Sequence, residues 1–376
     1  MLKELGGPAT AHRFIVKPLH SGGLVVCVSM LSTHPSVAER LHRLRALRGT
    51  AEDAPAGSAC LSSGRRWVKI RPAVSAHAFD FSIVVPTYNR PAQLEACLLA
   101  LAVLDYPKER FEVIVVDDGS AEPLSALVER FRDRLDLSLL RQANAGPAAA
   151  RNRGAEAARG NWLAFTDDDC RPAPAWLSVL ACQLAAWPGE VVGGRTLNGL
   201  TDNLCSTMSQ IIVDVVYRYY NPRAEAARFF ASNNLAMPRE LFLRMGGFDS
   251  AFTTSEDRDL CDRLTDAGVR MRYAPDCVVE HRHALSLWDY CHQHFHYGRG
   301  AFRFHRGQLE RRSRDTWSKT GFHLDLRNWL VYPFTQVAPR QWPGIGLLLC
   351  LWQLMNTAGF AIEAASHVAR RQSRLP

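Results

Sequence analysis

The chain has 376 residues, which is enough for a full hydrophobic core and for roughly two or three units of domain size. Its 47% hydrophobic and 22% charged residues are typical of a folded globular protein. The ten cysteines form no C-x-x-C pair, so the sequence suggests neither a disulfide framework nor a cysteine zinc knuckle, and it favours a reducing cytoplasm. The net charge of +8 suits an anionic partner, but no recognition motif accompanies it and we expect no nucleic-acid partner.

Residues 1–78 show no sustained periodicity and are rich in Ala, Arg, Ser and Gly, which predicts a loosely ordered N-terminal extension. The apolar run at residues 23–31 lies late for the hydrophobic region of a signal peptide. Met30 is a second candidate for the start of translation.

Strands and helices alternate from Phe81 onward. The runs "FSIVVPTY" (81–88) and "FEVIVVDD" (111–118) are rich in Val and Ile, as parallel strands buried on both faces are. The segment between them has helical periodicity, with Pro91 near its first turn. The alternation continues with a helix near 123–134, a strand at 137–142, a helix from 147 and a strand at 161–168. This order predicts an α/β fold with a doubly wound, mostly parallel sheet, whose ligands bind beyond the carboxyl ends of the strands.

The second half of the chain is more mixed. Residues 190–196 and 229–238 are predicted strands, and 238–249 is a predicted short helix closed by glycine. A helix with an acidic start follows at 255–268, and extended chain at 270–281.

Three consecutive acids in "FTDDDCRP" (165–172) follow the apolar run "NWLAF". If the strand continues through them, Asp167 and Asp169 share one face while Asp168 points the other way. Two acids that converge on one point need a cation, so the pattern predicts an ion site. The alternative is a solvated acidic loop.

Four motifs in order resemble the family 2 glycosyltransferases of GT-A fold: "VVPTYNR" (84–90), "VIVVDDGS" (113–120), "AGPAAARNRGAEAARGNWLAFTDDD" (145–169) and "TTSEDRDLCDRL" (253–264). The resemblance covers roughly residues 81–300. It implies an enzyme that transfers a sugar, with inversion, from a nucleotide-diphosphate donor to an acceptor hydroxyl in surface polysaccharide or glycolipid synthesis. It divides the chain into a nucleotide-sugar-binding half (79–195), an acceptor-binding half with the catalytic base (196–300) and a C-terminal helical region (301–376).

The resemblance places a set of residues at the nucleotide: Pro86, Tyr88, Arg90, Asp118, Arg151, Asp167 and Asp168. The Tyr88 ring is suited to stacking on a base, and Arg90 to negative charge. A carboxylate at Asp118 is able to accept the imide N–H of uracil, which favours a UDP-sugar. The alternatives are an ordinary strand-to-helix turn after residue 86 and a helix cap at "DDGS".

For a divalent cation, Mn²⁺ or Mg²⁺, that bridges the diphosphate, the resemblance implies Asp169, Asp167 and His281 as ligands. His283 is the alternative to His281. Six of the thirteen histidines fall between residues 281 and 305, which raises a zinc hypothesis. No carboxylate or cysteine set at zinc spacing accompanies them, so a polar helix or loop face is the simpler interpretation.

The helix that begins near Ser255 carries the predicted catalytic base. Ser255 is a suitable N-cap residue, and the resemblance makes Asp257 the group that deprotonates the acceptor. Glu256 also lies in the first turn, where capping alone explains an acid, and Asp259 is predicted to be a surface charge. The residues implied at the substrate or acceptor are Gly194, Asn233, Asn234, Glu256 and Arg299. For Gly194 a strand-end turn is an equally good interpretation.

Residues 342–362, "WPGIGLLLCLWQLMNTAGFAI", carry no formal charge and are long enough to span a bilayer. Gln353 and Asn356 weaken the spanning case, so we expect a helix that lies in or dips into the membrane, at the inner face of the cell membrane. The alternative is a buried helix of a soluble fold. The sequence has one candidate span and no Q-x-x-R-W motif, which by resemblance favours a non-processive enzyme acting on a carbohydrate or lipid-linked acceptor.

Two other function classes stay open at this stage. Glycoside hydrolysis by paired carboxylates leaves the nucleotide-type turn and Asp118 unexplained. A non-catalytic nucleotide-sugar-binding or membrane scaffold protein would keep the fold without the chemistry.

Overall fold

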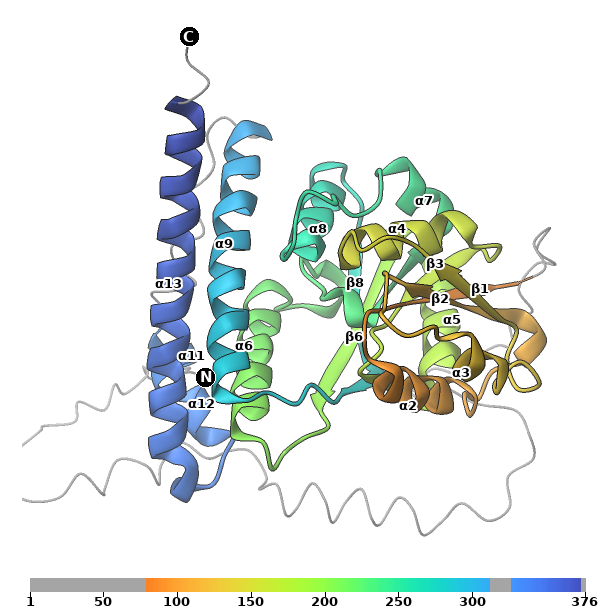
Figure 1. The fold of residues 1–376 in the computed structure, drawn as a ribbon, viewed down its shortest axis with the longest axis horizontal. Coiled ribbons are helices and arrows are strands. Elements are labelled where there is room, and N and C mark those ends of the chain that lie inside the picture. The colour runs from red at the N-terminus through yellow and green to blue at the C-terminus, as the bar shows by residue number, and fades with distance from the viewer. Residues whose placement is uncertain (1–78, 312–325, 373–376) are drawn as a thin grey trace, which may run out of the picture. The chain divides into compact units, whose positions relative to one another are not determined.

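The structure, a computed structural model, describes residues 79–311 and 326–372 (Figure 1). The predicted extension 1–78 and the candidate start Met30 lie outside the described residues. All described residues belong to one unit of the chain.

Eight strands form one sheet in the order β3-β2-β1-β4-β7-β6-β8-β5. The pairs β1–β2, β1–β4, β2–β3 and β6–β8 are parallel, whereas β4–β7, β5–β8 and β6–β7 are antiparallel. The doubly wound, mostly parallel sheet is therefore confirmed, with a mixed second half. The strands are β1 (Phe81–Thr87), β2 (Phe111–Asp117), β3 (Leu137–Arg141), β4 (Trp162–Phe165), β5 (Cys170–Pro172), β6 (Val191–Asn198), β7 (Leu235–Pro238) and β8 (Met271–His281).

Helices flank this sheet, and short 3₁₀ turns link some of the elements. The helices are α2 (Pro91–Leu101), α3 (Ser125–Glu129), α4 (Pro147–Ala157), α5 (Trp176–Ala186), α6 (Leu204–Tyr220), α7 (Arg239–Arg244), α8 (Glu256–Asp266), α9 (Leu287–Arg311), α11 (Leu326–Leu330), α12 (Tyr332–Thr335) and α13 (Trp342–Gln372). The 3₁₀ turns are η2 (Lys108–Arg110), η3 (Ala224–Ala226), η4 (Ser232–Asn234) and η6 (Pro339–Gln341).

Side-chain alternation along the strands produces one hydrophobic core on each face of the sheet. In β1, Ile83 and Val85 pack in the core that contains Leu98 of α2 and Trp176 of α5, whereas Val84 packs in the core beneath α4. Both faces of the parallel strands are covered, which explains why their sequences are continuous apolar runs.

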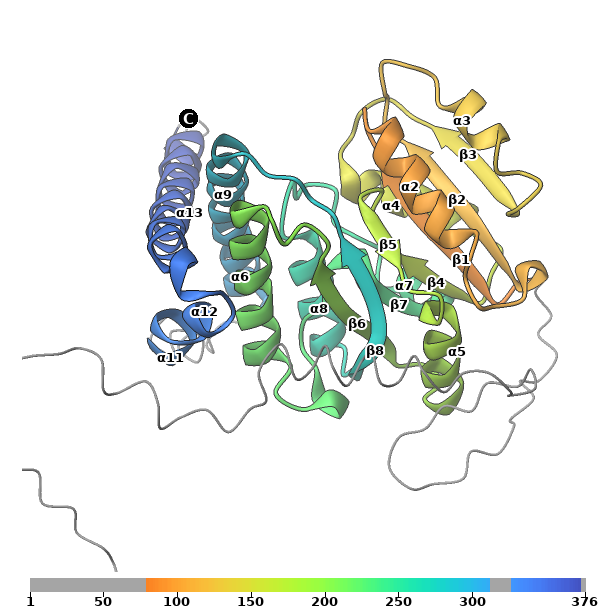
Figure 2. The same ribbon diagram turned by 90° about the horizontal axis from the view of Figure 1, so that it is seen from below.

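A third core joins α6 to α9 and α13 and includes Met208 of α6 and Trp352 of α13. Helices α9 and α13 lie side by side and run in the same direction (Figures 1 and 2). The absence of a side chain at Gly298 permits this approach, because a Cβ there would lie 2.1 Å from the carbonyl oxygen of Asn356. Helix α6 therefore connects the C-terminal helices to the part of the chain that contains the sheet.

The C-terminal apolar run forms most of α13, which continues beyond the predicted residue 362 to Gln372. In the described part of the chain, Pro339–Arg370, which comprises η6 and most of α13, is the one helical segment long and apolar enough to cross a membrane, and little of its most apolar part is buried. Glu363 is buried on α13, where its carboxylate pairs with Arg299 at 2.8 Å and Arg303 at 3.0 Å. The sequence places Arg299 at the substrate, whereas in the structure its guanidinium pairs with Glu363 of α13.

Two predicted wall residues are instead packing residues at the junction of β6, β7 and β8. A Cβ at Gly194 would lie 2.0 Å from the carbonyl oxygen of Cys277. Asn234 is fully buried; its Oδ1 accepts the indole N–H of Trp176 at 2.9 Å and its Nδ2 donates to the Cys277 carbonyl at 3.0 Å. The sequence places Gly194 and Asn234 at the acceptor, and the structure corrects this. Gly194 allows close packing of the backbone, and Asn234 forms a hydrogen bond with a buried backbone carbonyl.

The predicted strand at 229–238 is also shorter than expected. Its first part ends in the 3₁₀ turn η4, and only Leu235–Pro238 joins the sheet. Helix α6 was not predicted, although Asn203 caps it by accepting the Ser206 N–H at 2.8 Å, and its apolar side recurs at helical spacing.

Candidate functional site

The predicted polar residues gather at one edge of the sheet, beyond the carboxyl ends of β1, β2 and β4. This follows from the register, because β1 pairs in parallel with both neighbours, Thr87 beside Asp117 and Val84 beside Phe165. A ligand held at this edge would meet side chains from three strand ends at once.

The turn after β1 is tied to the turn after β2 through Asn89. Its backbone has φ of 54°, its N–H donates to Ser120 Oγ at 2.9 Å, and its Oδ1 accepts the Ala121 N–H at 2.8 Å. Tyr88 is 46% exposed at the rim of this turn, whereas Pro86 is buried within β1. Of these two predicted residues, only the Tyr88 ring is open to a ligand.

Asp118 is buried at the end of β2 and organises the loop before α4. One carboxylate oxygen accepts from Gln142 Nε2 at 2.7 Å and the Ala145 N–H at 2.9 Å, and the other from the Gly146 N–H at 2.8 Å. Since a carboxylate oxygen accepts two hydrogen bonds, the second oxygen has capacity for one more donor.

The orientation predicted for the three acids is wrong. Strand β4 ends at Phe165, and the acids lie in a turn closed by the Cys170 N–H donating to the Asp167 carbonyl at 3.1 Å. Asp168 does not point away from its neighbour, because Arg90 Nη1 lies 3.4 Å from Asp168 Oδ1 and 3.1 Å from Asp169 Oδ2. Strand alternation no longer applies once the strand has ended.

Opposite shifts of pKa distinguish Asp168 from Asp169. Burial and the adjacent charge of Asp169 raise the pKa of Asp168 to about 6, against the effects of Arg90 and of a 2.8 Å hydrogen bond from Thr87. Burial also acts to raise the pKa of Asp169, but the hydrogen bond and charge of His281 outweigh it and lower that pKa. Asp169 therefore keeps its negative charge to a lower pH than Asp168 does.

His281 lies beside Asp169, as predicted, because β5 and β8 pair with Cys170 opposite His281. The His281 Nε2 atom is 3.2 Å from Asp169 Oδ1. In the described part of the chain, Asp169, Cys170 and His281 form the one group of acids, cysteines and histidines whose ligand atoms all lie within 4.8 Å of one another. Burial raises the pKa of the Cys170 thiol well above its usual range, which leaves Asp169 and His281 as an oxygen and nitrogen pair suited to a divalent cation.

Asp167 is not in this group, because its carboxylate turns to Arg151. Arg151 Nη2 is 2.6 Å from Asp167 Oδ1, and its Nη1 is 2.9 Å from Glu256 Oε1. The guanidinium is buried and lies 5.6 Å from the centre of the Phe248 ring. Arg151 thus links the end of β4 to the start of α8.

The start of α8 is close to the prediction, with two differences. Ser255 is the N-cap residue, but it adopts a left-handed φ of 73° and its side chain makes no cap hydrogen bond. Asp259 is buried rather than a surface charge, and pairs with Arg263 at 2.7 Å and Arg311 at 2.9 Å. Asp257 Oδ1 accepts the Arg258 N–H at 2.7 Å.

Burial and the neighbouring charge of Glu256 raise the pKa of Asp257 to about 7, although the Arg258 N–H, Arg151 and Arg258 act to lower it. A carboxyl group with this pKa is able to gain and release a proton near neutral pH, as a general base must.

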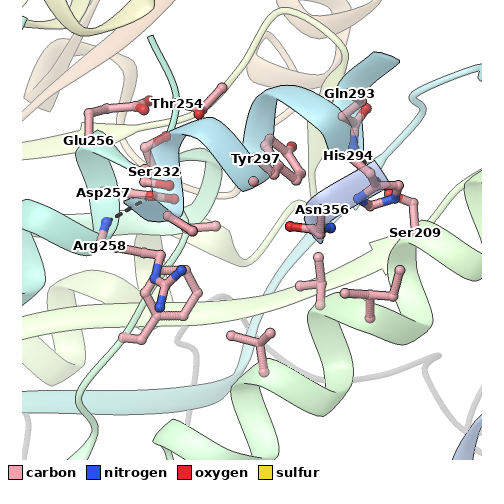
Figure 3. A pocket seen from close by; sticks show the side chains of 18 of the residues that line it. Ser209, Ser232, Thr254, Glu256, Asp257, Arg258, Gln293, His294, Tyr297 and Asn356 are labelled. Carbon is pink, nitrogen blue, oxygen red and sulfur yellow. Dashed lines mark hydrogen bonds between the residues drawn. The ribbon is translucent and has the colours of Figure 1, made fainter. Parts of the chain in front are cut away.

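Asp257 lines a cavity of about 950 Å³ (Figure 3). The cavity also contacts Arg151, Asp167, His281 and the predicted acceptor residue Asn233. It continues between α6, α9 and α13, where residues that the sequence did not single out line it, among them Ser209, Tyr297 and Asn356. For Ser209 the available signal is the amphipathic pattern of α6, because Ser206, Ser209 and Gln210 of that helix line the cavity.

Comparisons with known proteins give the family and the fold of the chain. Residues 82–246 match the sequence profile of glycosyl transferase family 2, and residues 204–366 that of glycosyl transferase family group 2. The glycosyltransferase AglE of Haloferax volcanii is 28% identical over 239 residues, which cover 58% of this chain and 72% of AglE. Validoxylamine A glucosyltransferase of Streptomyces hygroscopicus is 32% identical over 230 residues, 53% of this chain and 51% of that protein. The matched part of the chain spans about half the length of validoxylamine A glucosyltransferase.

Among solved structures, the mannosyltransferase PcManGT from Pyrobaculum calidifontis, in complex with GDP-Man and Mn²⁺, is similar with a TM-score of 0.54 and 22% identity. The similarity covers 77% of this chain and 87% of that one. At this identity the likeness is one of fold, and it confirms the GT-A architecture predicted from the four motifs.

Glu256→Gln tests the electrostatic origin of the high pKa of Asp257. Removing one nearby negative charge should lower the pKa of Asp257 below 7, so its carboxylate would form at more acidic pH. Carbon-13 NMR of the side-chain carboxyl groups measures this titration directly. Glu240→Gln, at an exposed acid in the first turn of α7, is the matched control and should leave it unchanged. An unaltered Asp257 titration in Glu256→Gln would assign the shift to burial alone.

Proposed function

Because the chain belongs to glycosyl transferase family 2, we propose that it moves a sugar from a nucleotide-diphosphate donor to an acceptor hydroxyl, with inversion at the anomeric carbon. The observation that carries this proposal is the position of Asp257. It lies in the cavity next to Glu256, and Arg151 connects Glu256 to the acids at the strand ends. A proton acceptor for the acceptor hydroxyl therefore adjoins the edge at which a donor would bind.

The donor binds, in this proposal, over the carboxyl ends of β1, β2 and β4. Tyr88 is exposed for stacking on the base, and Asp118 retains capacity for one further donor such as the imide N–H of uracil. We therefore keep UDP as the proposed nucleotide. PcManGT was solved with GDP-Man, so GDP is the comparison that a binding experiment must include.

Asp169 and His281 would hold a divalent cation, Mn²⁺ or Mg²⁺. The fit is supported by the lowered pKa of Asp169 and by the position of His281 Nε2, 3.2 Å from Asp169 Oδ1. When bound, such a cation supplies Lewis-acid stabilisation of the departing diphosphate. Asp167 is excluded from this inner pair as long as Arg151 holds its carboxylate.

Asp257 takes the proton of the acceptor hydroxyl while that oxygen forms a bond to C1 of the donor sugar. The bond from C1 to the diphosphate oxygen breaks in the same displacement, and the electron pair leaves with the nucleoside diphosphate. Attack from the face opposite the leaving group inverts C1. With the pKa of Asp257 near 7, its carboxylate form and the transfer rate should increase as pH rises through neutrality.

We propose further that the enzyme is non-processive and works at the cytoplasmic surface of a membrane, on a carbohydrate or lipid-linked acceptor in polysaccharide or glycolipid synthesis. The support for the membrane surface is the exposed apolar stripe of α13, in which Leu347, Leu354 and Ile362 are 59%, 60% and 51% exposed. The buried ion pairs of Glu363 with α9 argue for a helix that lies on a membrane rather than one that spans it.

Asp257→Asn should reduce sugar transfer by about 10² to 10⁴-fold, because a positioned base is lost, and leave nucleotide binding intact. Transfer is measured with UDP-sugars, and binding of UDP and GDP by titration calorimetry. Asp202→Asn, at an exposed acid, is the control. Full turnover by Asp257→Asn would remove it as the base, and binding without transfer by the native chain would favour the non-catalytic alternative.

Asp169→Asn should weaken Mn²⁺ binding at least about tenfold, because an ionised ligand is replaced by a neutral one. Electron paramagnetic resonance of free Mn²⁺ measures this without any turnover. Asp168→Asn should have the smaller effect, since Asp168 is outside the group formed with His281. Equal losses in the two variants would mean that the turn as a whole, and not Asp169, holds the ion.

The double substitution of Leu347 and Leu354 by Glu should release the chain from vesicles that contain anionic lipids. Each buried Leu contributes about 1.5–3 kcal/mol to membrane partitioning, so the partition coefficient should fall at least about tenfold. Co-sedimentation with the full chain measures it, and Leu243→Glu, at an exposed Leu of α7, is the control. If the native chain does not co-sediment with the vesicles, membrane association is refuted.

A further inference from the structure

His294 on α9 lines the cavity, yet it takes no part in the proposed reaction. It is 1% exposed, and both ring nitrogens are buried without a hydrogen-bond partner among the described residues. Edge contacts with Tyr290 and Tyr297, at ring-centre distances of 4.4 and 5.6 Å, hold the imidazole in place. Buried polar atoms are normally paired, so a fixed ring with two unmatched nitrogens indicates a partner that the described residues do not supply.

The surroundings of His294 are polar but uncharged. Gln293, Ser209 and Asn356 lie at the same end of the cavity (Figure 3), and Gln293 Nε2 donates to Ser209 Oγ at 3.3 Å. Burial lowers the pKa of His294 to about 3, so its ring is neutral, with one nitrogen that donates and one that accepts. This combination matches a hydroxyl group, which also donates and accepts, and the neutral ring offers no positive charge to a phosphate.

The distance along α9 relates His294 to the reacting end of the cavity. Tyr297 lies between Asp257 and His294 in the cavity (Figure 3), and the charges of Asp257 and Glu256 act on its hydroxyl. His294 is three residues earlier on the same helix, a rise of about 4.5 Å. This step is comparable to the length of one sugar ring, so a sugar unit beside Tyr297, at the Asp257 end of the cavity, would place its neighbour at His294.

We propose that His294 is a specificity-determining residue that hydrogen-bonds a hydroxyl of a neutral sugar unit next to the one that receives the transferred sugar. The acceptor then carries at least two sugar units, and the one at His294 is uncharged. The proposal rests on the proposed function, because it assigns the unit at Asp257 as the one that reacts.

The test measures the binding of neutral sugars to the full chain. The probes are methyl glycosides of disaccharides built from glucose, galactose, mannose and N-acetylglucosamine, each with its matching methyl monosaccharide, titrated by saturation-transfer NMR in the presence of UDP and Mn²⁺. At least one disaccharide should bind more tightly than its monosaccharide. His294→Phe keeps the ring and its contacts but removes both nitrogens, and should abolish that advantage, a loss of at least about fivefold.

His294→Gln restores a donor and an acceptor and should recover part of the advantage, which a merely structural role of the ring would not allow. His292→Phe is the matched control, an exposed histidine on the same helix, and should bind as the native chain does. The proposal is overturned if no disaccharide binds more tightly than its monosaccharide, or if the advantage survives His294→Phe. Failure of the proposed function is separate, since it would appear as absence of any turnover of nucleotide sugars, with or without acceptor.

Discussion

The buried contact of Arg151 with Asp167 and Glu256 is the interaction on which the site depends. Its two nitrogens reach acids from two different elements, at 2.6 and 2.9 Å, and the guanidinium itself is almost fully buried. Removing one member of such a buried pair typically costs about 3–5 kcal/mol, because a charge is left without compensation. Arg151 therefore fixes the distance between the strand ends, where a donor would bind, and helix α8, which carries Asp257.

The acids at this edge of the sheet differ in the basic side chains that contact them. Arg90 contacts Asp168 and Asp169, and His281 adds its imidazole to Asp169 alone. The result is a set of neighbouring carboxyl groups with different proton affinities: Asp169 is ionised, whereas the pKa of Asp257 is raised to about 7. Carboxyl groups whose environments separate their pKa values in this way are able to take separate tasks, ion binding for one and proton transfer for the other.

The C-terminal helices close the cavity in addition to supplying an apolar surface. Helix α13 packs along α9 with the buried Glu363 between them, contributes Asn356 to the cavity, and leaves Leu347 and Leu354 exposed on another side. A segment that resembles a membrane span in composition thus has two different faces. If α13 lies on a membrane as proposed, the cavity is close to that membrane, because the same helix lines both.

Local sequence determined the alternating strands and helices, the acids at the strand ends and the start of α8 near Asp257, because hydrophobic periodicity and turn residues act over a few neighbours. The pairing of Asp169 with His281 was also within reach, through the motif resemblance. Only the tertiary structure decided that the three acids lie in a turn, that Asn234 and Gly194 are packing residues, that Arg299 belongs to Glu363 and that His294 faces the cavity. For Asn234, Gly194 and Arg299 the deciding contact joins segments far apart in the chain, as Arg299 and Glu363 are at a separation of 64 residues. Burial and pKa values depend on such distant partners, and a local sequence pattern does not show which residues these partners are.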